Sequence, residues 1–292
     1  MAANTRDIRR RIKSVKNTSQ ITKAMQMVAA AKMRKAQNAA TAGRSYADLL
    51  RRVLSSLAGR VEEGAHPLLS EREVKKELVL VIATDKGLCG ALNTNLFREV
   101  AKFDPERSIF VVIGKKATQF LSRSRRQVIA EFNLKENFHF LEAKQVSKFC
   151  MEKFMAGDVD KVTVVFTDFV NTLTQVPRTR TILPITSFEI ADVLGSAEAK
   201  VATAENTTDY IFEPSSKSVL ESVLPHYVHF QVYQMVLDSR ASEHSARMVA
   251  MKNATDNAKQ LIKDLTLEYN KIRQAAITTE LLEITTAQMS LG

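Results

Sequence analysis

The stretch LDSRASEHSARMVAMKNATDNAKQLIKDLTLEYNKIRQAA, residues 237–276, decides the fold of this chain. Alternate steps of four and three residues along it select twelve positions, and ten of them are apolar. These positions are Leu237, Ala241, His244, Met248, Met251, Thr255, Ala258, Ile262, Leu265, Tyr269, Ile272 and Ala276. Apolar residues at this 3.5-residue spacing are typical of a coiled-coil seam, sustained here for more than five heptads. A single helix cannot bury its own seam, so we expect a partner helix.

Glycine and proline are nearly absent from both ends of the chain. Of the 15 such residues, 12 lie between Gly59 and Pro214, and only Gly43, Pro225 and Gly292 lie outside that window. Because these residues interrupt secondary structure, the ends are expected to be long helices. A C-terminal helix over residues 215–289 is predicted, about 110 Å long, which Pro225 kinks rather than ends.

The N-terminal end supplies the partner helix, predicted over residues 5–58. The same alternation gives Ile8, Ile12 and Val15, lapses at Ser19, Thr22 and Gln26, and resumes from Ala29 to Leu57. Through the lapse the apolar row is expected to move to Ile21, Met25 and Val28. In an antiparallel pair the longer C-terminal helix leaves an overhang over residues 274–291. Its apolar side chains have no partner helix in this chain, so another protein is expected to receive them.

The middle of the chain alternates between strand and helix patterns. Strands are expected at 78–83, 109–113, 128–132 and 162–166, helices at 94–103, 116–121 and 143–155, and edge strands around 179–185 and 210–212. This order favours a mainly parallel sheet with helices on both faces. The predicted fold class is α/β: a long antiparallel coiled coil of the two terminal helices plus a central Rossmann-like domain. The expected domains are residues 1–59, 60–214 and 215–292.

The residues give little support to a catalytic, metal or cofactor site. The turn TDKGLCG lacks the glycine spacing of a dinucleotide fingerprint, and Gly114-Lys115 is followed by lysine instead of the serine or threonine of a phosphate loop. Cys89 and Cys150 lie far apart in the sequence and form no CxxC pair. His226 and His229 have a spacing that suits a metal, but no third ligand stands nearby. Gly87 and Gly90 are expected to form a tight turn.

The chain's excess positive charge lies between positions 1 and 60. This segment holds 14 Lys and Arg against Asp7 and Asp48, a balance of +12, whereas the whole chain carries +10. Such a basic N-terminus is also typical of a mitochondrial transit peptide, although the pattern continues to Arg52. Two other interpretations stay open: a nucleic-acid-binding protein that uses the basic helix, and a nucleotide-dependent enzyme built on the central sheet.

At 45% hydrophobic residues the chain is not disordered, and no apolar run approaches a membrane span.

Three segments resemble the gamma subunits of F-type ATP synthase. They are NTSQITKAMQMVAAAKMRKAQ (17–37), TDKGLCGALN (84–93) and ASEHSARMVAMKNATDNAKQLIKDLTLEYNKIRQAAITTELLEI (241–284). The resemblance implies a non-catalytic rotor shaft that serves ATP synthesis and hydrogen-ion transport. Its partners are the alpha and beta subunits of a hexameric head, the epsilon subunit and the c-ring, with no nucleic acid. Membrane contact is implied only through the complex.

The resemblance also implies roles for individual residues. Met25 and Arg247 face an acidic segment of beta, and Arg273, Gln274 and Thr278 make polar contacts higher in the head. Ile277, Leu281, Leu282 and Ile284 form a C-terminal bearing, and Tyr210 and Glu213 belong to the foot beside the c-ring and epsilon. The alternatives are that Met25 only fills the seam and that Arg247 is a solvated helix residue.

Two departures from the family pattern matter. The tail TTAQMSLG is more polar than the small apolar tail usual in the family. No cysteine lies between Phe188 and Tyr210, where chloroplast relatives carry a regulatory dithiol, so thiol control is not expected. With no leader evident, the expected location is the cytoplasmic side of a bacterial inner membrane, as a peripheral protein.

Overall fold

The computed structural model describes residues 2–43, 66–135, 138–185 and 212–291, together with positions 46, 49–50, 52–54 and 56. The chain forms two compact units. The first, which we call the coiled-coil unit, combines Met1–Ala31 with Arg247–Gly292. The second, which we call the sheet unit, is Lys32–Ala246. The predicted division at residues 59 and 214 stays a prediction.

The sheet unit contains five strands in the order β3-β2-β1-β4-β5. They are β1 (Glu77–Ile82), β2 (Ser108–Ile113), β3 (Val128–Phe132), β4 (Lys161–Phe169) and β5 (Gln175–Leu183). The first four pair in parallel, and β5 pairs antiparallel with β4 at the edge. The mainly parallel sheet is therefore confirmed. In the second expected edge strand, Tyr210 lies outside the described residues and Phe212 is not in a strand.

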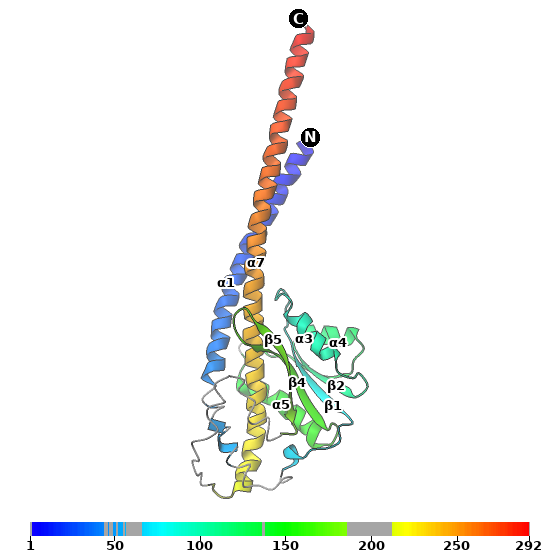
Figure 1. Cartoon of the computed structure of the whole chain (residues 1–292), viewed down its shortest axis with the longest axis vertical. Helices are drawn as coiled ribbons and strands as arrows, with labels where there is room; N and C mark the ends of the chain where they lie inside the picture. Colours follow the sequence, from blue (N-terminus) through cyan, green and yellow to red (C-terminus); the bar gives the residue numbers. More distant parts are fainter. Residues whose placement is uncertain are drawn as a thin grey trace. The chain divides into compact units, whose positions relative to one another are not determined.

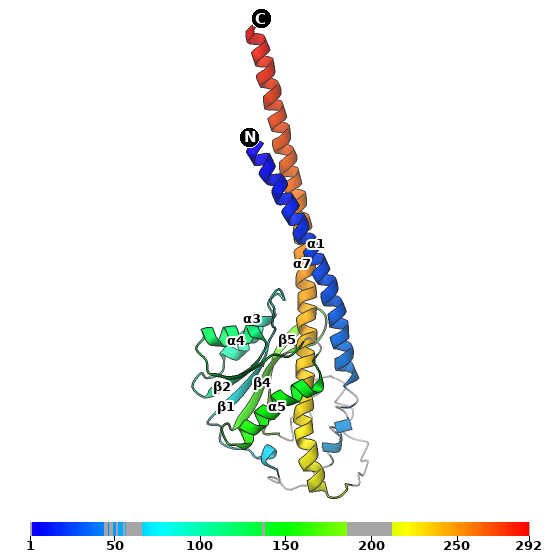
Figure 2. The same ribbon diagram turned by 180° about the vertical axis from the view of Figure 1, so that it is seen from behind.

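Helices cover both faces of this sheet because successive side chains of a strand point to opposite faces. One face packs against α3 (Leu92–Ala101) and α4 (Lys115–Arg123), through Val79 and Val81 of β1. The other packs against α5 (Phe140–Met155) and the first part of α7 (Ser216–Leu291), through Leu78, Leu80 and Ile82. Figure 2 shows α5 in front of the strands, with α3 and α4 beyond them. A short 3-10 helix, η1 (Pro67–Leu69), packs on the same face of the sheet as α5 and α7.

The C-terminal helix is α7, which runs for 76 residues from Ser216 to Leu291 and continues through Pro225. The N-terminal helix is α1 (Ala2–Ala42), with 41 residues, so the prediction of one helix over 5–58 is wrong beyond Ala42. A turn follows at Gly43, and positions 46, 49–50, 52–54 and 56 are again helical. A Cβ at Gly43 would lie 3.2 Å from Gln234 Oε1 and 3.3 Å from Phe230 Cζ, so the chain passes close to α7 there.

In the coiled-coil unit, α1 and α7 run antiparallel side by side (Figure 1). Thr22 lies opposite Thr255 and Arg9 lies opposite Tyr269, so the numbering falls along α1 while it rises along α7. All twelve seam positions predicted on α7 are buried or half-buried, with Leu237, Ala241 and His244 in the sheet unit and the others along this pair. The coiled-coil prediction is confirmed.

The predicted shift of the apolar row on α1 is wrong. Ile21 and Val28 are 60% and 53% exposed, whereas the polar Ser19, Thr22 and Gln26 are half-buried in the seam. The uninterrupted four-three alternation keeps the same face of α1 toward α7, and a one-residue step would rotate it away. The hydroxyl oxygens of Thr22 and Thr255 lie 2.7 Å apart, so the two hydroxyls bond each other within the seam.

Candidate functional site

The last part of α7 carries apolar side chains that stay exposed within the part of the chain that the structure describes. Every side chain from Glu280 to Met289 is exposed. Ile277, Leu281, Leu282 and Ile284, the predicted bearing residues, are between 49% and 61% exposed. Figure 1 shows this end of α7 continuing past the N-terminal end of α1 within the coiled-coil unit. We call residues 277–289 the helical tip.

The threonines make the helical tip less polar than its sequence suggests. Thr278 and Thr279 donate their hydroxyl protons to the carbonyls of Gln274 and Ala275, four residues back, at 2.9 Å. Thr285 does the same toward Leu281 at 3.0 Å, and Thr286 toward Leu282. Such back-bonding satisfies the hydroxyl protons within the helix. The only charged side chains of the tip are then Glu280 and Glu283.

The predicted stator-contact residues fall into two environments. Met25 and Arg247 are half-buried, whereas Arg273 and Gln274 are exposed below the helical tip, with Thr278 at its start. Met25 lies next to the α1 seam, where Ala29 is 2% exposed. Its contact with a partner stays a prediction. Of the two foot residues, Tyr210 lies outside the described residues and Glu213 is exposed just before α7.

Sequence reasoning missed an exposed apolar row on α1. Ile21, Met27 and Val28 are all more than half exposed, and Lys23 stands among them. The sequence pattern predicts Ile21 and Val28 in the seam, whereas their side chains point away from α7. The continued four-three alternation through polar residues was the signal that could have revealed it.

The carboxyl ends of β1 and β4, where a doubly wound sheet binds ligands, are covered by α7. Arg240 and Glu243 of α7 line a cavity there of only about 10 Å³, together with Thr84, Asn93 and Thr167. A site for a small molecule has a volume of about 300–1,000 Å³. Gly114 in the neighbouring turn has φ +96°, a backbone conformation that favours glycine. The cavity at the carboxyl ends of these strands therefore has room for about one water, and not for a nucleotide.

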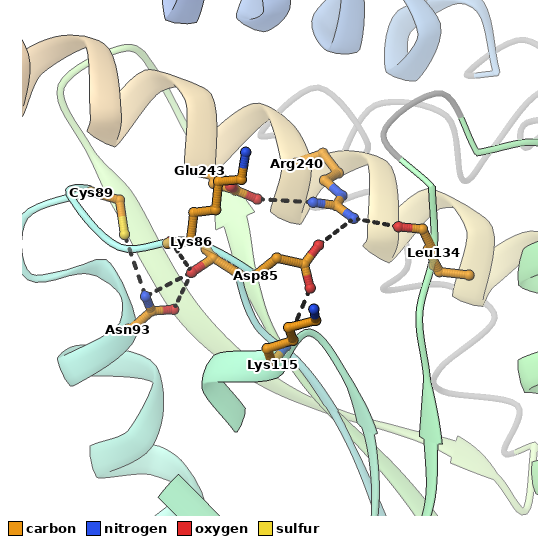
Figure 3. A network of polar contacts seen from close by, with 9 residues as sticks. Asp85, Lys86, Cys89, Asn93, Lys115, Leu134, Arg240 and Glu243 are labelled. Atoms are coloured by element: carbon orange, nitrogen blue, oxygen red, sulfur yellow. Dashed lines mark hydrogen bonds and ion pairs between the residues drawn. The ribbon is translucent and has the colours of Figure 1, made fainter. Parts of the chain in front are cut away.

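Hydrogen bonds and ion pairs connect α7 with the turns at the carboxyl ends of the strands (Figure 3). The guanidinium of Arg240 lies 3.6 Å from Asp85 Oδ2, and donates to Glu243 Oε2 and to the carbonyl of Leu134 at 3.2 Å each. Asp85 Oδ1 accepts from the backbone N–H of Lys115, the first residue of α4, at 3.2 Å. In the adjacent turn, Asn93 donates to Thr84 Oγ1 at 2.8 Å.

The two histidines suggested by their spacing as metal ligands have separate packing partners. His226 Nε2 lies 2.6 Å from the hydroxyl of Tyr46, and His229 Nδ1 lies 2.6 Å from Ser147 Oγ of α5. Burial lowers the pKa of His229 to about 4, with help from the nearby Lys144 and His226. Among the described residues no three His, Cys, Asp or Glu side chains gather as metal ligands would. No helix within the described ranges has both the length and the apolar character to cross a bilayer.

Known proteins resemble this chain along nearly its whole length. A family model described as ATP synthase matches residues 4–291. The ATP synthase gamma chain of Methylacidiphilum infernorum is 50% identical and covers 99% of this chain and 100% of its own length. That of Opitutus terrae is also 50% identical, covering 99% of both chains.

Solved structures give the same result. A chain of the central stalk and c-ring structure of Tetrahymena thermophila mitochondrial ATP synthase matches with a TM-score of 0.62 and 27% identity, over 80% of this chain and 99% of that one. A chain of the Euglena gracilis mitochondrial ATP synthase rotor has the same fold, with a TM-score of 0.63 and 20% identity, over 95% and 100%. The chain therefore belongs to the ATP synthase gamma chain family, and its function is that of the rotor shaft.

Proposed function

We propose that this rotor shaft carries no catalytic site and couples ion flow through a membrane c-ring to the conformational cycle of a hexameric alpha and beta head. The observation that carries the proposal is the antiparallel coiled coil with its bare helical tip. An apolar helix end that the described part of its own chain leaves exposed is expected to lie against another protein. Epsilon and the c-ring are the proposed partners of the foot.

The chemistry of the helical tip suits a surface that turns inside a sleeve. Apolar contacts are non-directional, so they resist rotation less than hydrogen bonds and ion pairs do. The threonine protons of the tip are satisfied within the helix, and only two charges stand on it. Ile277, Leu281, Leu282 and Ile284 are the proposed bearing. Arg273, Gln274 and Thr278 are proposed to make the polar contacts at its base.

The basic α1 is proposed to face an acidic segment of beta. The segment 1–60 carries a balance of +12, which attracts an acidic surface and steers its approach. Met25 and Arg247 are the proposed contacts, and the exposed Ile21 and Val28 add an apolar row beside them.

The contacts of the foot and its location are proposed from the resemblance to the family. Tyr210 and Glu213 are proposed to contact the c-ring and epsilon. Membrane contact is then made only through the complex, as a peripheral part of it. The proposed place is the cytoplasmic side of a bacterial inner membrane, and the two relatives named above are bacterial.

Reconstitution with alpha and beta subunits tests this function. The full chain should join a hexameric head at one copy per head and raise its ATPase turnover, measured with the mass of the complex. A chain truncated after Ile272 should join less tightly, because it lacks the helical tip. So should a variant that combines Ile277→Ser, Leu281→Ser, Leu282→Ser and Ile284→Ser. The control is Leu267→Ser, which changes a leucine that is 70% exposed below the tip.

Failure of the full chain to join the head or change its turnover would overturn the rotor function. The basic α1 should then be tested against nucleic acid across a salt series, since binding through phosphates weakens steeply with salt. Equal binding by the full chain and the serine variant would overturn the bearing alone.

A further inference from the structure

One face of α7 within the sheet unit is polar although it is buried. Its residues are Ser239, Arg240, Ser242, Glu243 and Ser245, which we call the clamp face. Ser242 and Ser245 are fully buried, and the side chain of Arg240 is 13% exposed. Burying polar groups stabilises a fold only when they find partners, so each contact of this face needs an explanation.

Arg240 links two separate segments of the sheet unit to α7 and bonds a third group on α7 itself. Its guanidinium reaches Asp85 after β1, the carbonyl of Leu134 after β3, and Glu243 one turn along its own helix. Asp85 in turn accepts from the N–H of Lys115, at the start of α4. The planar guanidinium has donors in fixed directions, so it holds these groups at defined angles. Figure 3 shows the three oxygens converging on it.

The serines link the clamp face to β4 and the turn after it. Ser242 donates to the carbonyl of Thr167 at 3.2 Å, and the N–H of Thr167 points to Ser239 Oγ at 3.4 Å. Ser245 donates to the carbonyl of Thr172 at 2.7 Å. In the sheet, β1 pairs with β4 only as far as Val165, and the β5 residue opposite Thr167 is Pro177, which has no N–H. The α7 helix therefore supplies partners that the strands do not.

We propose that the clamp face, with Arg240 at its centre, locks α7 against rolling and sliding on the sheet, so that torque applied to the foot reaches the shaft without slip. This inference rests on the proposed rotor function. The rest of the α7 contact with the sheet is apolar, through residues such as Leu224, Val228 and Val232. Packed helices slide over such surfaces by small shear movements. Hydrogen bonds and an ion pair of fixed direction, to the segments after β1 and β3, to β4 and to the β4–β5 turn, oppose movement along and around the helix axis. Arg240 is thus a positioning residue, which touches no substrate.

The test is the torsional stiffness of single rotating molecules. The head is fixed to a surface, a bead is attached to the foot through Lys102→Cys, a change at an exposed position, and the angular variance of the bead is measured while turnover is arrested. The variants are Arg240→Gln and the pair Ser242→Ala with Ser245→Ala, which leaves no buried charge unpaired. Arg178→Gln is the control, because Arg178 pairs with Asp168 at 2.7 Å between β5 and β4.

Both clamp variants should show a larger angular variance than the wild type, while the control does not. ATP hydrolysis by the head should stay unchanged in all of them, since the chemistry lies in another subunit. If Arg240→Gln does not assemble, the serine pair decides. An unchanged variance in the serine pair, with a bead that still turns, overturns the clamp and leaves the rotor function intact. A wild-type bead that never turns under ATP overturns both.

Discussion

Replacement of Gly114 by alanine is expected to destabilise the sheet unit strongly. Gly114 follows β2 at φ +96°, and a Cβ there would lie 2.3 Å from Ala83 O and 2.8 Å from Ala83 C. Both atoms are backbone at the end of β1, so no side chain can turn away to relieve the contact. Positive φ and overpacking each cost about 1–3 kcal/mol, so we expect a total loss of about 4 kcal/mol.

The buried thiol of Cys150 measures this loss. Cys150 lies on α5 in the core of the sheet unit, and burial raises its pKa to about 12. A thiol reagent reacts with it only when the unit opens, because the thiolate is the reactive form. With Cys89→Ala present throughout, the labelling rate follows the population of the open state. Since each 1.36 kcal/mol is a factor of ten, Gly114→Ala should label about a thousandfold faster.

Gly87→Ala is the matched control, in a turn at the same end of the sheet. A Cβ at Gly87 would meet no atom within 4 Å, and its φ is not in the glycine-favouring region. Its effect should stay within about 0.5 kcal/mol, or roughly a factor of two in labelling rate. If the two alanine variants label at similar rates, the steric reasoning about Gly114 is wrong.

Three further changes give distinct results. His229 has a pKa of about 4 in the folded protein and an ordinary value near 6.5 when unfolded, so the free energy of unfolding of the sheet unit should fall by up to about 3 kcal/mol as the pH drops from 6.5 to 4. Urea unfolding at each pH measures this fall. In His229→Gln the free energy of unfolding should depend less on pH. Thr22→Val with Thr255→Val should stabilise the coiled-coil unit by about 1 kcal/mol in thermal unfolding followed by circular dichroism, since a half-buried and a buried hydroxyl give way to methyl groups of the same shape. A loss of stability would mean that the bond between the hydroxyls contributes more than their burial costs. Ile21→Ser with Val28→Ser should leave that unfolding unchanged but weaken binding to the head in a pull-down with alpha and beta; unchanged binding would exclude this row from the interface.

Periodicity predicted the parts of the fold that depend on local pattern. The four-three alternation placed every α7 seam residue, and the continuous apolar run at 78–82 marked a strand buried on both faces. The same reasoning failed on α1 at Ser19, Thr22 and Gln26. It read polarity as exposure, whereas the antiparallel partner supplied Thr255 as a bonding partner from a distant part of the sequence.

The contacts of the clamp face lay beyond sequence reasoning for the same physical reason. Arg240 and Asp85 are far apart in the sequence, and only the parallel order of the strands brings the turn after β1 beneath α7. Gly114 was judged only as a failed phosphate loop, although its role is the close approach of two turns. Long-range pairing decides which polar residues are buried, and a local pattern does not carry that information.

A single helix meets two opposite demands in this chain. A shaft must be held firmly where torque enters and must turn easily where it lies in its sleeve. On α7 the first demand falls on residues 239–245, where buried hydrogen bonds and ion pairs of fixed direction hold the helix to the sheet. The second is proposed to fall on residues 277–289, where exposed aliphatic side chains and threonines bonded to their own helix present few groups for directional contacts. The contrast follows from the physics of the two kinds of contact, since directional bonds resist rotation and apolar surfaces do so only weakly. Adding hydrogen-bonding groups to the tip should therefore slow rotation, whereas removing them from the clamp face should soften the shaft.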